Sequence, residues 1–413
     1  MFDLDKYREI WQTIARNKVR SVLTGFGVLW GIFMYVVMMG LGNGIENRIM
    51  SAISNVTQNA VFIYSNVTSV DYKGFNSGRW WHITNDDMKL IKQNIPEIEY
   101  VSGLLEWMSD NPVTKGEKSG EYMINGIDNA YQKITPSPLI YGRYFNDIDM
   151  TECRKMCVIG ERVYEELFNK GENPIGQRIA VDRVHYTVVG VVESGDVNLF
   201  GDAATTIFIP ASTFQQVYNY GQEIDMMMVS AYGNVDIKLI EKQVKDVLKA
   251  RHYIAPEDDM AVMSFNIKEF FTMFKYLFLG LDILIWIVGM GTMLAGVVGV
   301  SNIMLVSIRE RTQEIGIRRA LGAKPGVILT QIMSESTVLT FIAGFFGLFF
   351  GILTLSAIDT FTGQESQIFK DPYISFSLAI VASLIILISG AIAGIIPARS
   401  ALRVKAIDAI RDE

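Results

Sequence analysis

The stretch RERTQEIGIRRALGA, residues 309–323, constrains the whole fold, because it is charged and helix-forming yet lies between two long apolar runs. The run before it, 277–307, contains one ionisable side chain, Asp282. About 20 mostly apolar residues are enough to cross a bilayer as a helix. Four segments reach that length, so four transmembrane helices are expected: 19–41, 277–307, 327–358 and 374–397.

Residues 309–323 are expected to form a short helix that ends abruptly within the loop 308–326. Glu314 and Arg318 are spaced i, i+4, which supports a helix. Gly322 is placed to cap the end of that helix, and Pro325 prevents its continuation.

Basic residues are distributed unevenly about these four spans. Of the 37 Lys and Arg residues, 15 lie outside 42–276, and 14 of those 15 lie on one side of the four-span arrangement. Cytoplasmic segments of membrane proteins are enriched in Lys and Arg. Both termini and 308–326 are therefore expected in the cytoplasm, including a tail, 398–413. The region 42–276 and the loop 359–373 are expected outside it.

The exported region has the composition of an ordinary soluble domain. It carries 31 Asp and Glu against 22 Lys and Arg, and this acidic balance argues against a nucleic-acid partner. Strand-like and helix-like segments alternate, which predicts an α+β domain with two subdomains. Helical patterns at its two ends, 42–55 and 266–278, predict that spans one and two continue as a protruding pair of helices. The expected fold class is thus a membrane α-helical protein of four transmembrane helices, with a large α+β extracytoplasmic domain inserted between helices 1 and 2.

Several local features of the domain can be predicted. A helix is expected to open with a capping box from Thr84 to Asp87, and Asp86 and Asp87 are interpreted as helix-cap and solvated groups. A hairpin is expected to turn at Asp182-Arg183. The Met226–Met228 run is interpreted as core filler rather than a binding surface.

The two cysteines, Cys153 and Cys157, are expected to be free thiols, with Cys157 buried. MCVIG resembles a buried strand, and four residues of extended chain span roughly 13 Å. Disulfide-linked Cα atoms must lie within about 7 Å.

The N-terminal segment 1–18 places Leu4, Tyr7, Trp11 and Ile14 at helical spacing. This predicts an amphipathic helix on the inner membrane surface. The alternative is a helix packed against protein.

The sequence lacks the motifs of the common catalytic and metal sites. His82, His185 and His252 are far apart, and neither HExxH nor paired-Cys spacing occurs. G-x-S-x-G is absent, as is the P-loop pattern G-x-x-x-x-G-K-[ST], which is the usual means of binding ATP. We therefore expect a non-catalytic chain without a cofactor or metal of its own.

Apolar side chains distinguish the 309–323 helix from a simple topological loop. Ile315, Ile317 and Leu321 lie in a loop that should face water. A short, rigid, partly apolar helix suits docking in a groove on a cytoplasmic partner. The enrichment of Lys and Arg in cytoplasmic loops would by itself explain the Arg residues of this stretch, but not its apolar residues.

The motif ERTQEIGIRRALGA resembles the coupling helix of MacB/FtsX-type ABC transporter permeases, which contacts the ATPase. The stretch VIGERVYEELF followed by NPIGQRIAVDRVHYTVVGVVESGD is similar to the MacB-type periplasmic core domain, and PARSALRVKAIDAIR is similar to the end of the family's last span and tail. The resemblance covers nearly the whole chain. MacB itself carries an ATPase domain that this sequence lacks, so the resemblance implies a separate ATPase chain.

The resemblance also implies a mechanism and partners. A cytoplasmic ABC ATPase would hold ATP and Mg²⁺ and move the coupling helix, and the motion would reach the periplasmic domain for efflux or extraction of an envelope substrate. A second permease, identical or a paralogue, membrane lipid, and a periplasmic adaptor or outer-membrane component are further implied partners, with the chain in the bacterial inner membrane. Gly316 would let the helix approach the ATPase closely. The implied ATPase-coupling residues are Arg309, Glu310, Arg311, Thr312, Glu314, Ile315, Gly316, Ile317 and Arg318.

Two polar residues of the spans are functional candidates. A charge within a span, such as Glu335, is costly and suggests function by default. The alternative is a hydrogen bond from Glu335 to Ser301 or Asn302. Small-residue patterns also recur within the spans, and packing within one subunit is favoured over a dimer contact. They are Gly27 and Gly31; Gly344, Gly347 and Gly351; and Gly390 and Gly394.

A different class of function remains open. A membrane-anchored receptor or sensor, whose exported domain binds a ligand without an ATPase motor, would share the same topology. An anchored enzyme has no visible active site. Co-purification with an ATPase separates the permease from both.

Overall fold

The computed structural model describes residues 18–54, 56–109, 111–193, 202–362 and 376–402. The chain divides into two compact units, one made of Met1–Arg48 and Tyr276–Glu413 and the other of Ile49–Lys275. The predicted amphipathic helix lies outside the described residues, as do most of the predicted loop 359–373 and the tail after Leu402.

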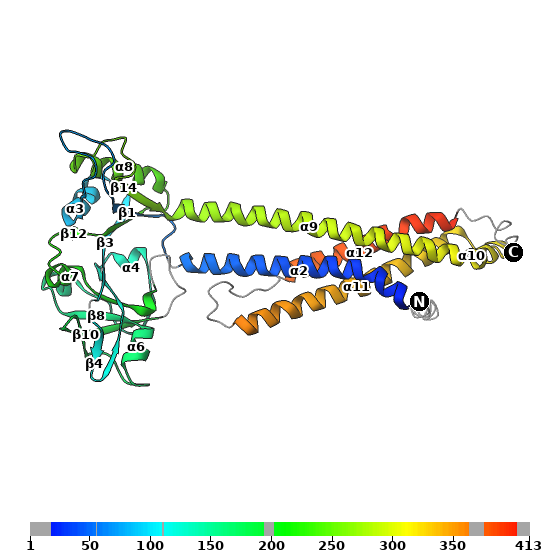
Figure 1. Cartoon of the computed structure of the whole chain (residues 1–413), viewed down its shortest axis with the longest axis horizontal. Coiled ribbons are helices and arrows are strands. Elements are labelled where there is room, and N and C mark those ends of the chain that lie inside the picture. The colour runs from blue at the N-terminus through cyan, green and yellow to red at the C-terminus, as the bar shows by residue number, and fades with distance from the viewer. Residues whose placement is uncertain (1–17, 55, 110, 194–201, 363–375, 403–413) are drawn as a thin grey trace. The chain divides into compact units, whose positions relative to one another are not determined.

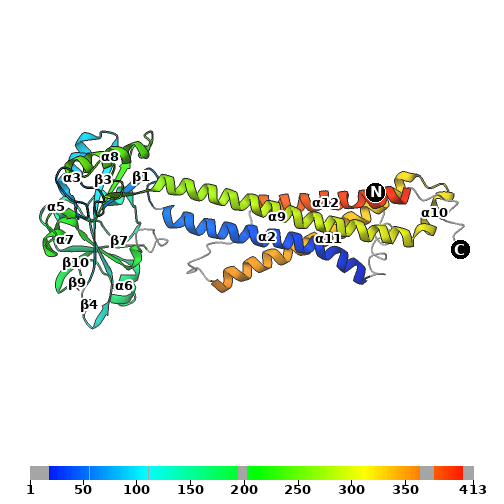
Figure 2. The ribbon, with the colours of Figure 1, turned by 45° about the horizontal axis from the view of Figure 1, so that its top comes forward.

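The first unit is helical. Figures 1 and 2 show its long helices alongside one another. Among the described residues, four helices are long and apolar enough to cross a membrane, which confirms the four predicted spans. The helices with residues in this unit are α2 (Lys18–Ser54), α9 (Ile267–Glu310), α10 (Thr312–Ala320), α11 (Pro325–Thr362) and α12 (Phe376–Leu402).

The last helix is longer than predicted. Its apolar run was expected to end at residue 397, but α12 continues to Leu402 with Pro397 inside it. Proline removes one helical hydrogen bond without forbidding the helix. Ala398 and Ala401 are buried in the helical core, and this packing favours the extra turn.

Close helix approach depends on glycine. A Cβ on Gly27 of α2 would lie 3.2 Å from the Cα of Gly296 in α9, and one on Gly347 of α11 would lie 2.5 Å from the carbonyl oxygen of Leu29. Only a residue without a side chain allows such contacts. The predicted packing of the small residues within one subunit is confirmed.

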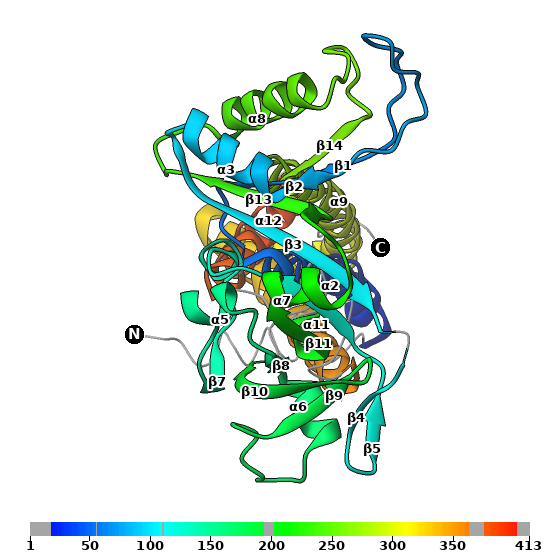
Figure 3. The same ribbon diagram turned by 90° about the vertical axis from the view of Figure 1, so that its left-hand side faces the viewer.

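The second unit is built on a mixed sheet (Figure 3). Its hydrogen-bonded strand order is β14-β1-β13-β3-β6-β11-β8-β10-β9-β4-β5, with β7 pairing β10. The pairs β8–β10 and β6–β11 are parallel. The strands are β1 (Ala60–Ser65), β3 (Ile98–Met108), β4 (Val113–Lys115), β5 (Lys118–Gly120), β6 (Met123–Ile127), β7 (Leu139–Gly142), β8 (Met156–Gly160), β9 (Arg178–Val181), β10 (Val184–Val192), β11 (Thr206–Pro210), β13 (Met226–Ala231) and β14 (Val262–Asn266), and a separate pair is formed by β2 (Ile83–Thr84) and β12 (Glu223–Ile224).

Helices cover this sheet around distinct hydrophobic cores. One core joins α3 and α8 to β1 and β13, and another joins α6 and α7 to β8 through β11. The long strand β3 contributes to both, through Ile98 and Leu105 respectively. The two predicted subdomains correspond to these two cores on one sheet, and a third core joins them through Phe62 of β1, Leu104 of β3 and Val158 of β8. The helices of this unit are α3 (Asn85–Asn94), α4 (Tyr131–Ile134), α5 (Asp147–Thr151), α6 (Glu161–Leu167), α7 (Ala211–Val217) and α8 (Ile237–Arg251), with a 3₁₀ turn at Ala203–Thr205.

Most of the local predictions hold. Asp182 and Arg183 have φ of 46° and 67° in the turn between the antiparallel strands β9 and β10, as predicted for a hairpin. Met227 and Met228 are buried, which confirms the core interpretation. Both cysteines are free, and Cys157 is buried.

The capping box at Thr84 is confirmed, but the interpretation of Asp87 as a solvated group was wrong. Asp87 is fully buried, with its carboxylate 2.6 Å from Nε of Arg251 and 3.0 Å from Nε2 of His252. These partners are about 165 residues away in sequence, so no local pattern could reveal them.

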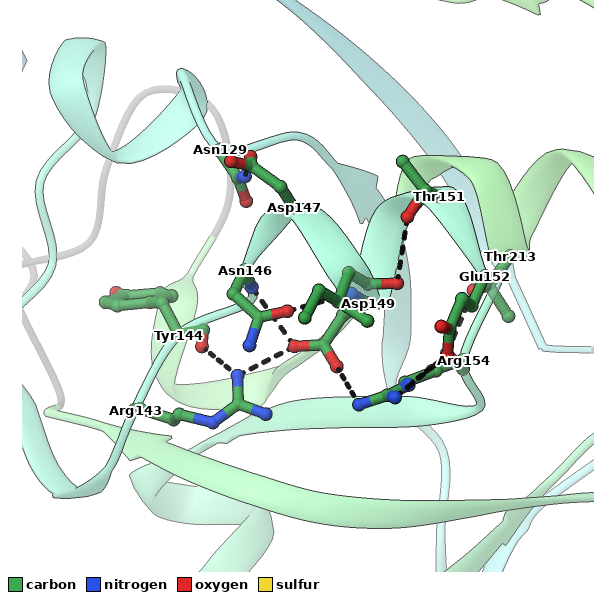
Figure 4. A network of polar contacts seen from close by, with 11 residues as sticks. Asn129, Arg143, Tyr144, Asn146, Asp147, Asp149, Thr151, Glu152, Arg154 and Thr213 are labelled. Atoms are coloured by element: carbon green, nitrogen blue, oxygen red, sulfur yellow. Dashed lines mark hydrogen bonds and ion pairs between the residues drawn. The ribbon is translucent and has the colours of Figure 1, made fainter.

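Asp149 organises a second buried polar network (Figure 4). Its carboxylate accepts a hydrogen bond from Nη1 of Arg143 at 2.7 Å and one from the backbone N–H of Asn146 at 3.1 Å. Nη1 of Arg154 lies 3.7 Å from the other oxygen. Asn146 and Asp149 form the capping box of α5, so this carboxylate holds both the helix and the turn before it.

The Asp149 network should be pH-dependent. Burial alone would raise the pKa of Asp149, but hydrogen bonds from Arg143 and Asn146 and the charges of Arg143 and Arg154 outweigh it and lower the pKa. A carboxyl group with a lowered pKa stabilises the fold at any pH above the ordinary carboxyl pKa. This stabilisation is lost as the pH falls from the ordinary pKa through the lowered pKa of the folded state.

We predict that Asp149→Asn destabilises α5 at pH 7 by about 1–3 kcal/mol, because a charged hydrogen-bond acceptor is lost. Hydrogen exchange of α5 amides in the full chain should then be about 5- to 150-fold faster. The difference from the parent should shrink as the pH falls below the ordinary carboxyl pKa of about 4, and it should vanish only once the pH passes the lowered pKa of Asp149. Asp147→Asn, an exposed site two residues earlier in the same helix, is the control, and equal exchange in both variants would contradict the role of Asp149.

Candidate functional site

The predicted helix of the 309–323 stretch is present as α10, at the end of the helical unit where α9 ends and α11 begins (Figures 1 and 2). Its C-terminus has the predicted glycine cap. Gly322 has φ of +92°, its N–H donates to the carbonyl of Arg319, and the N–H of Ala323 donates to that of Arg318. This pair of bonds is a Schellman motif, which terminates a helix in a fixed direction.

The other end of α10 is joined to α9 through a single residue. The N–H of Arg311 donates to the carbonyls of Ser307 and Ile308, and the hydroxyl of Thr312 donates to those of Ile308 and Arg309. The carbonyls at the end of α9 therefore bond to the first residues of α10. The direction of α10 is set at both ends.

One face of α10 packs within this chain. Gly316 is buried, and Ile315 packs against the core that includes Ile308, Ile328 and Ile332. The expectation that Gly316 faces a partner is therefore not met in this conformation. The sequence placed these residues on a helix but held no information on which face α11 would cover.

The opposite side of α10 is open. Ile317 is 46% exposed and Leu321 is 84% exposed, and Arg309, Glu310 and Gln313 are exposed as well. We call Ile317 and Leu321 the apolar outer face. Exposed apolar side chains beside Arg and Glu at a helix surface are typical of a protein-binding site.

The arginines of α10 form contacts within the chain. Arg318 pairs with Glu314 at 2.7 Å, as the i, i+4 spacing predicted, and also donates to Oε1 of Gln331 at 3.0 Å. Arg319 donates to the carbonyl of Leu402, the last residue of α12, at 3.0 Å.

Glu335 has an ionic partner that the sequence did not predict. Its carboxylate lies 3.6 Å from Nη1 of Arg311. The hydroxyl of Ser301, one of the two expected partners, donates instead to the carbonyl of Ala393, and Asn302 is exposed. Gln331 precedes Glu335 by four residues, and this spacing was the signal that could have identified a shared polar face.

A cavity of about 40 Å³ lies between these side chains. Its polar lining comes from Ser307, Arg311, Glu314, Arg318, Gln331 and Glu335, and its apolar lining from Met304, Ile308, Ile315, Ile328 and Ile332. The positive and negative charges balance, so the cavity is not an anion site. Among the residues described by the structure, no group of His, Cys, Asp or Glu could hold a metal ion.

Comparison with known proteins covers both units. Residues 21–247 match the family described as MacB-like periplasmic core domain, and residues 286–406 match that described as FtsX-like permease C-terminal. The chain is 28% identical over 405 residues to the macrolide export ATP-binding/permease protein MacB of Bdellovibrio bacteriovorus, covering 98% of this chain and 61% of that protein. It is 26% identical over 422 residues to the pyoverdine export ATP-binding/permease protein PvdT of Pseudomonas putida, covering 99% and 60%.

The periplasmic region of MacB from Actinobacillus actinomycetemcomitans is a similar solved structure. It has a TM-score of 0.44 and 19% identity, covering 55% of this chain and 97% of that one. The chain spans about three fifths of the length of the curated relatives that it matches.

Proposed function

Because the chain belongs to the MacB/FtsX-type family of ABC transporter permeases, we propose that it couples a separate cytoplasmic ATPase to conformational change of its exported domain. The observation that carries this proposal is the apolar outer face of α10. Ile317 and Leu321 are exposed on a helix whose direction is fixed by the Gly322 cap and the Arg311 junction. A rigid helix with an apolar surface is suited to a groove on a partner.

The partner supplies the ATP chemistry. The 413-residue sequence has no P-loop pattern, so ATP and Mg²⁺ would be bound by the ATPase chain. This chain would contribute the docking helix and the spans that move with it. The residues proposed for contact are Ile317 and Leu321 as apolar anchors, with Arg309, Glu310 and Glu314 at the rim.

Two helices provide the route for motion. α9 is one continuous helix from Ile267 to Glu310, so a displacement at one end can be carried along its hydrogen-bonded backbone toward the other. α2 likewise runs from Lys18 to Ser54. We propose that movement of α10 is carried along α9 and α2 to the domain between them.

Export or extraction of an envelope substrate is the proposed outcome. The relatives named above are macrolide and pyoverdine export proteins. A second permease, and a periplasmic adaptor or outer-membrane component, are proposed as further partners. The assembly would lie in the bacterial inner membrane, with both termini and α10 in the cytoplasm.

Orientation can be tested by cysteine labelling. In a Cys153→Ser background, we predict that Ser77→Cys reacts with an impermeant maleimide in intact spheroplasts, whereas Gln313→Cys reacts only after lysis. Both positions are exposed, and Cys157 is buried. The physical reason is the concentration of Lys and Arg on the α10 side. The opposite labelling pattern would show that the topology is the inverse of the one predicted.

Docking can be tested at the outer face of α10. We predict that Leu321→Asp weakens ATPase binding by about 30-fold, because a central apolar anchor is worth about 2 kcal/mol. The measurement is co-purification of an ABC ATPase with the full chain, together with ATP hydrolysis by the complex. Leu239→Asp in α8, at a position 62% exposed, is the matched control.

Both variants should insert into the membrane like the parent, because both leucines are exposed. If the parent captures no ABC ATPase, the receptor interpretation is favoured. If Leu321→Asp binds and hydrolyses like the parent, α10 is not the contact.

A further inference from the structure

Two arginines, Arg311 at the junction of α9 and α10 and Arg318 of α10, meet two side chains of α11. Arg311 and Arg318 are seven residues apart, and Gln331 and Glu335 are four apart, so each pair lies on one face of its helix. Arg311 lies 3.6 Å from Glu335, and Arg318 lies 3.0 Å from Gln331. The first of the two arginines in sequence, Arg311, thus meets the later residue of α11, Glu335, and the second, Arg318, meets the earlier one, Gln331. We call these four residues the polar clamp.

Glu335 depends on this arrangement. It is 8% exposed and lies ten residues inside the apolar helix that starts at Pro325. A carboxylate is costly in such a position unless a cation lies nearby. Arg311 lies within ion-pair distance of Glu335, and it is the junction residue between α9 and α10. Glu335 is therefore tied to the point where the second span meets α10.

The two contacts of the clamp differ in kind. The Arg318–Gln331 distance is that of a direct hydrogen bond, and Arg318 is also held by Glu314 at 2.7 Å. The Arg311–Glu335 distance exceeds the roughly 2.8 Å of a direct charged hydrogen bond. The adjoining cavity of about 40 Å³ gives Arg311 room to adjust. The Arg318–Gln331 hydrogen bond fixes the position of α10 against α11. The Arg311–Glu335 ion pair attracts the two helices but tolerates small displacements between them.

We infer that Glu335 is a positioning residue that ties α10 to α11, so that displacement of α10 is passed to the third span as well as to α9. This inference rests on the proposed function, because it assumes that a partner displaces α10. The contact of Arg319 with the carbonyl of Leu402 extends the same link to α12. The arginines of α10 thus serve mainly to fasten it to its own spans, and its outer face is left for the partner.

The first readout tests the clamp without any partner. Spin labels at Gln313 of α10 and Phe345 of α11, both exposed, report the distance between the two helices in the full chain in nanodiscs, in a Cys153→Ser background. We expect one narrow distance distribution in the parent. Glu335→Gln should broaden or shift it. Glu257→Gln, an exposed carboxamide substitution in the other unit, should not.

The second readout tests transmission. Glu335→Gln and Arg311→Gln should each lower ATP hydrolysis by the complex by about fivefold or more, while the ATPase still co-purifies. The reversed pair, Arg311→Glu with Glu335→Arg, should restore activity to within about twofold of the parent. Restoration by reversal would show that the two side chains act together through their opposite charges, rather than each through separate packing.

Each outcome decides the inference. A parent-like distance distribution in Glu335→Gln, or a reversed pair as defective as the single variants, would overturn it. If Glu335→Gln or Arg311→Gln fails to insert into the membrane, the reversed pair decides the inference, through its distance distribution and its ATP hydrolysis. Loss of ATPase binding in the parent would refute the proposed function but not the clamp, since the distance readout needs no ATPase.

Discussion

The hydrocarbon interior of a membrane offers no hydrogen-bond partners, and most of the helical unit follows from that constraint. Backbone groups must be satisfied within each helix, which accounts for the four long spans. Because water is absent there, the hydrophobic effect does not drive one helix against another. Helix contacts therefore depend on close packing at glycines such as Gly27 and Gly347. The same constraint favours an ion pair for the buried Glu335, which has Nη1 of Arg311 3.6 Å away, and it favours positions at the end of the bundle for the other arginines of this region.

Properties that depend on local chemistry were predictable from the sequence. The spans, the Gly322 cap, the Asp182-Arg183 hairpin and the capping box at Thr84 each require residues only a few positions apart. The propensity of a short peptide is enough to specify them. The exported domain's alternation of strands and helices was equally visible, because several of its strands, such as β1 and β10, are marked by runs of β-branched and aromatic residues.

Properties that depend on distant partners were not predictable. Asp87 was interpreted as solvated because Arg251 and His252 lie far along the chain. The partner of Glu335 was missed because the position of the Arg311 side chain depends on how α9 and α10 meet, which no local pattern specifies. The assignment of Gly316 to a partner surface failed for a related reason, since helical periodicity separates two faces without saying which of them the rest of the chain covers. In the candidate site, the helix was predicted and its orientation was not.

The sharing of β3 between two cores has a consequence for cooperativity. Ile98 and Leu105 lie on one strand, so that strand cannot leave either core without disturbing the other. Two lobes joined by a flexible linker could melt one after the other, but two lobes that share a central strand should unfold together. A destabilising substitution in β3 should therefore lower the stability of the entire domain rather than of one lobe.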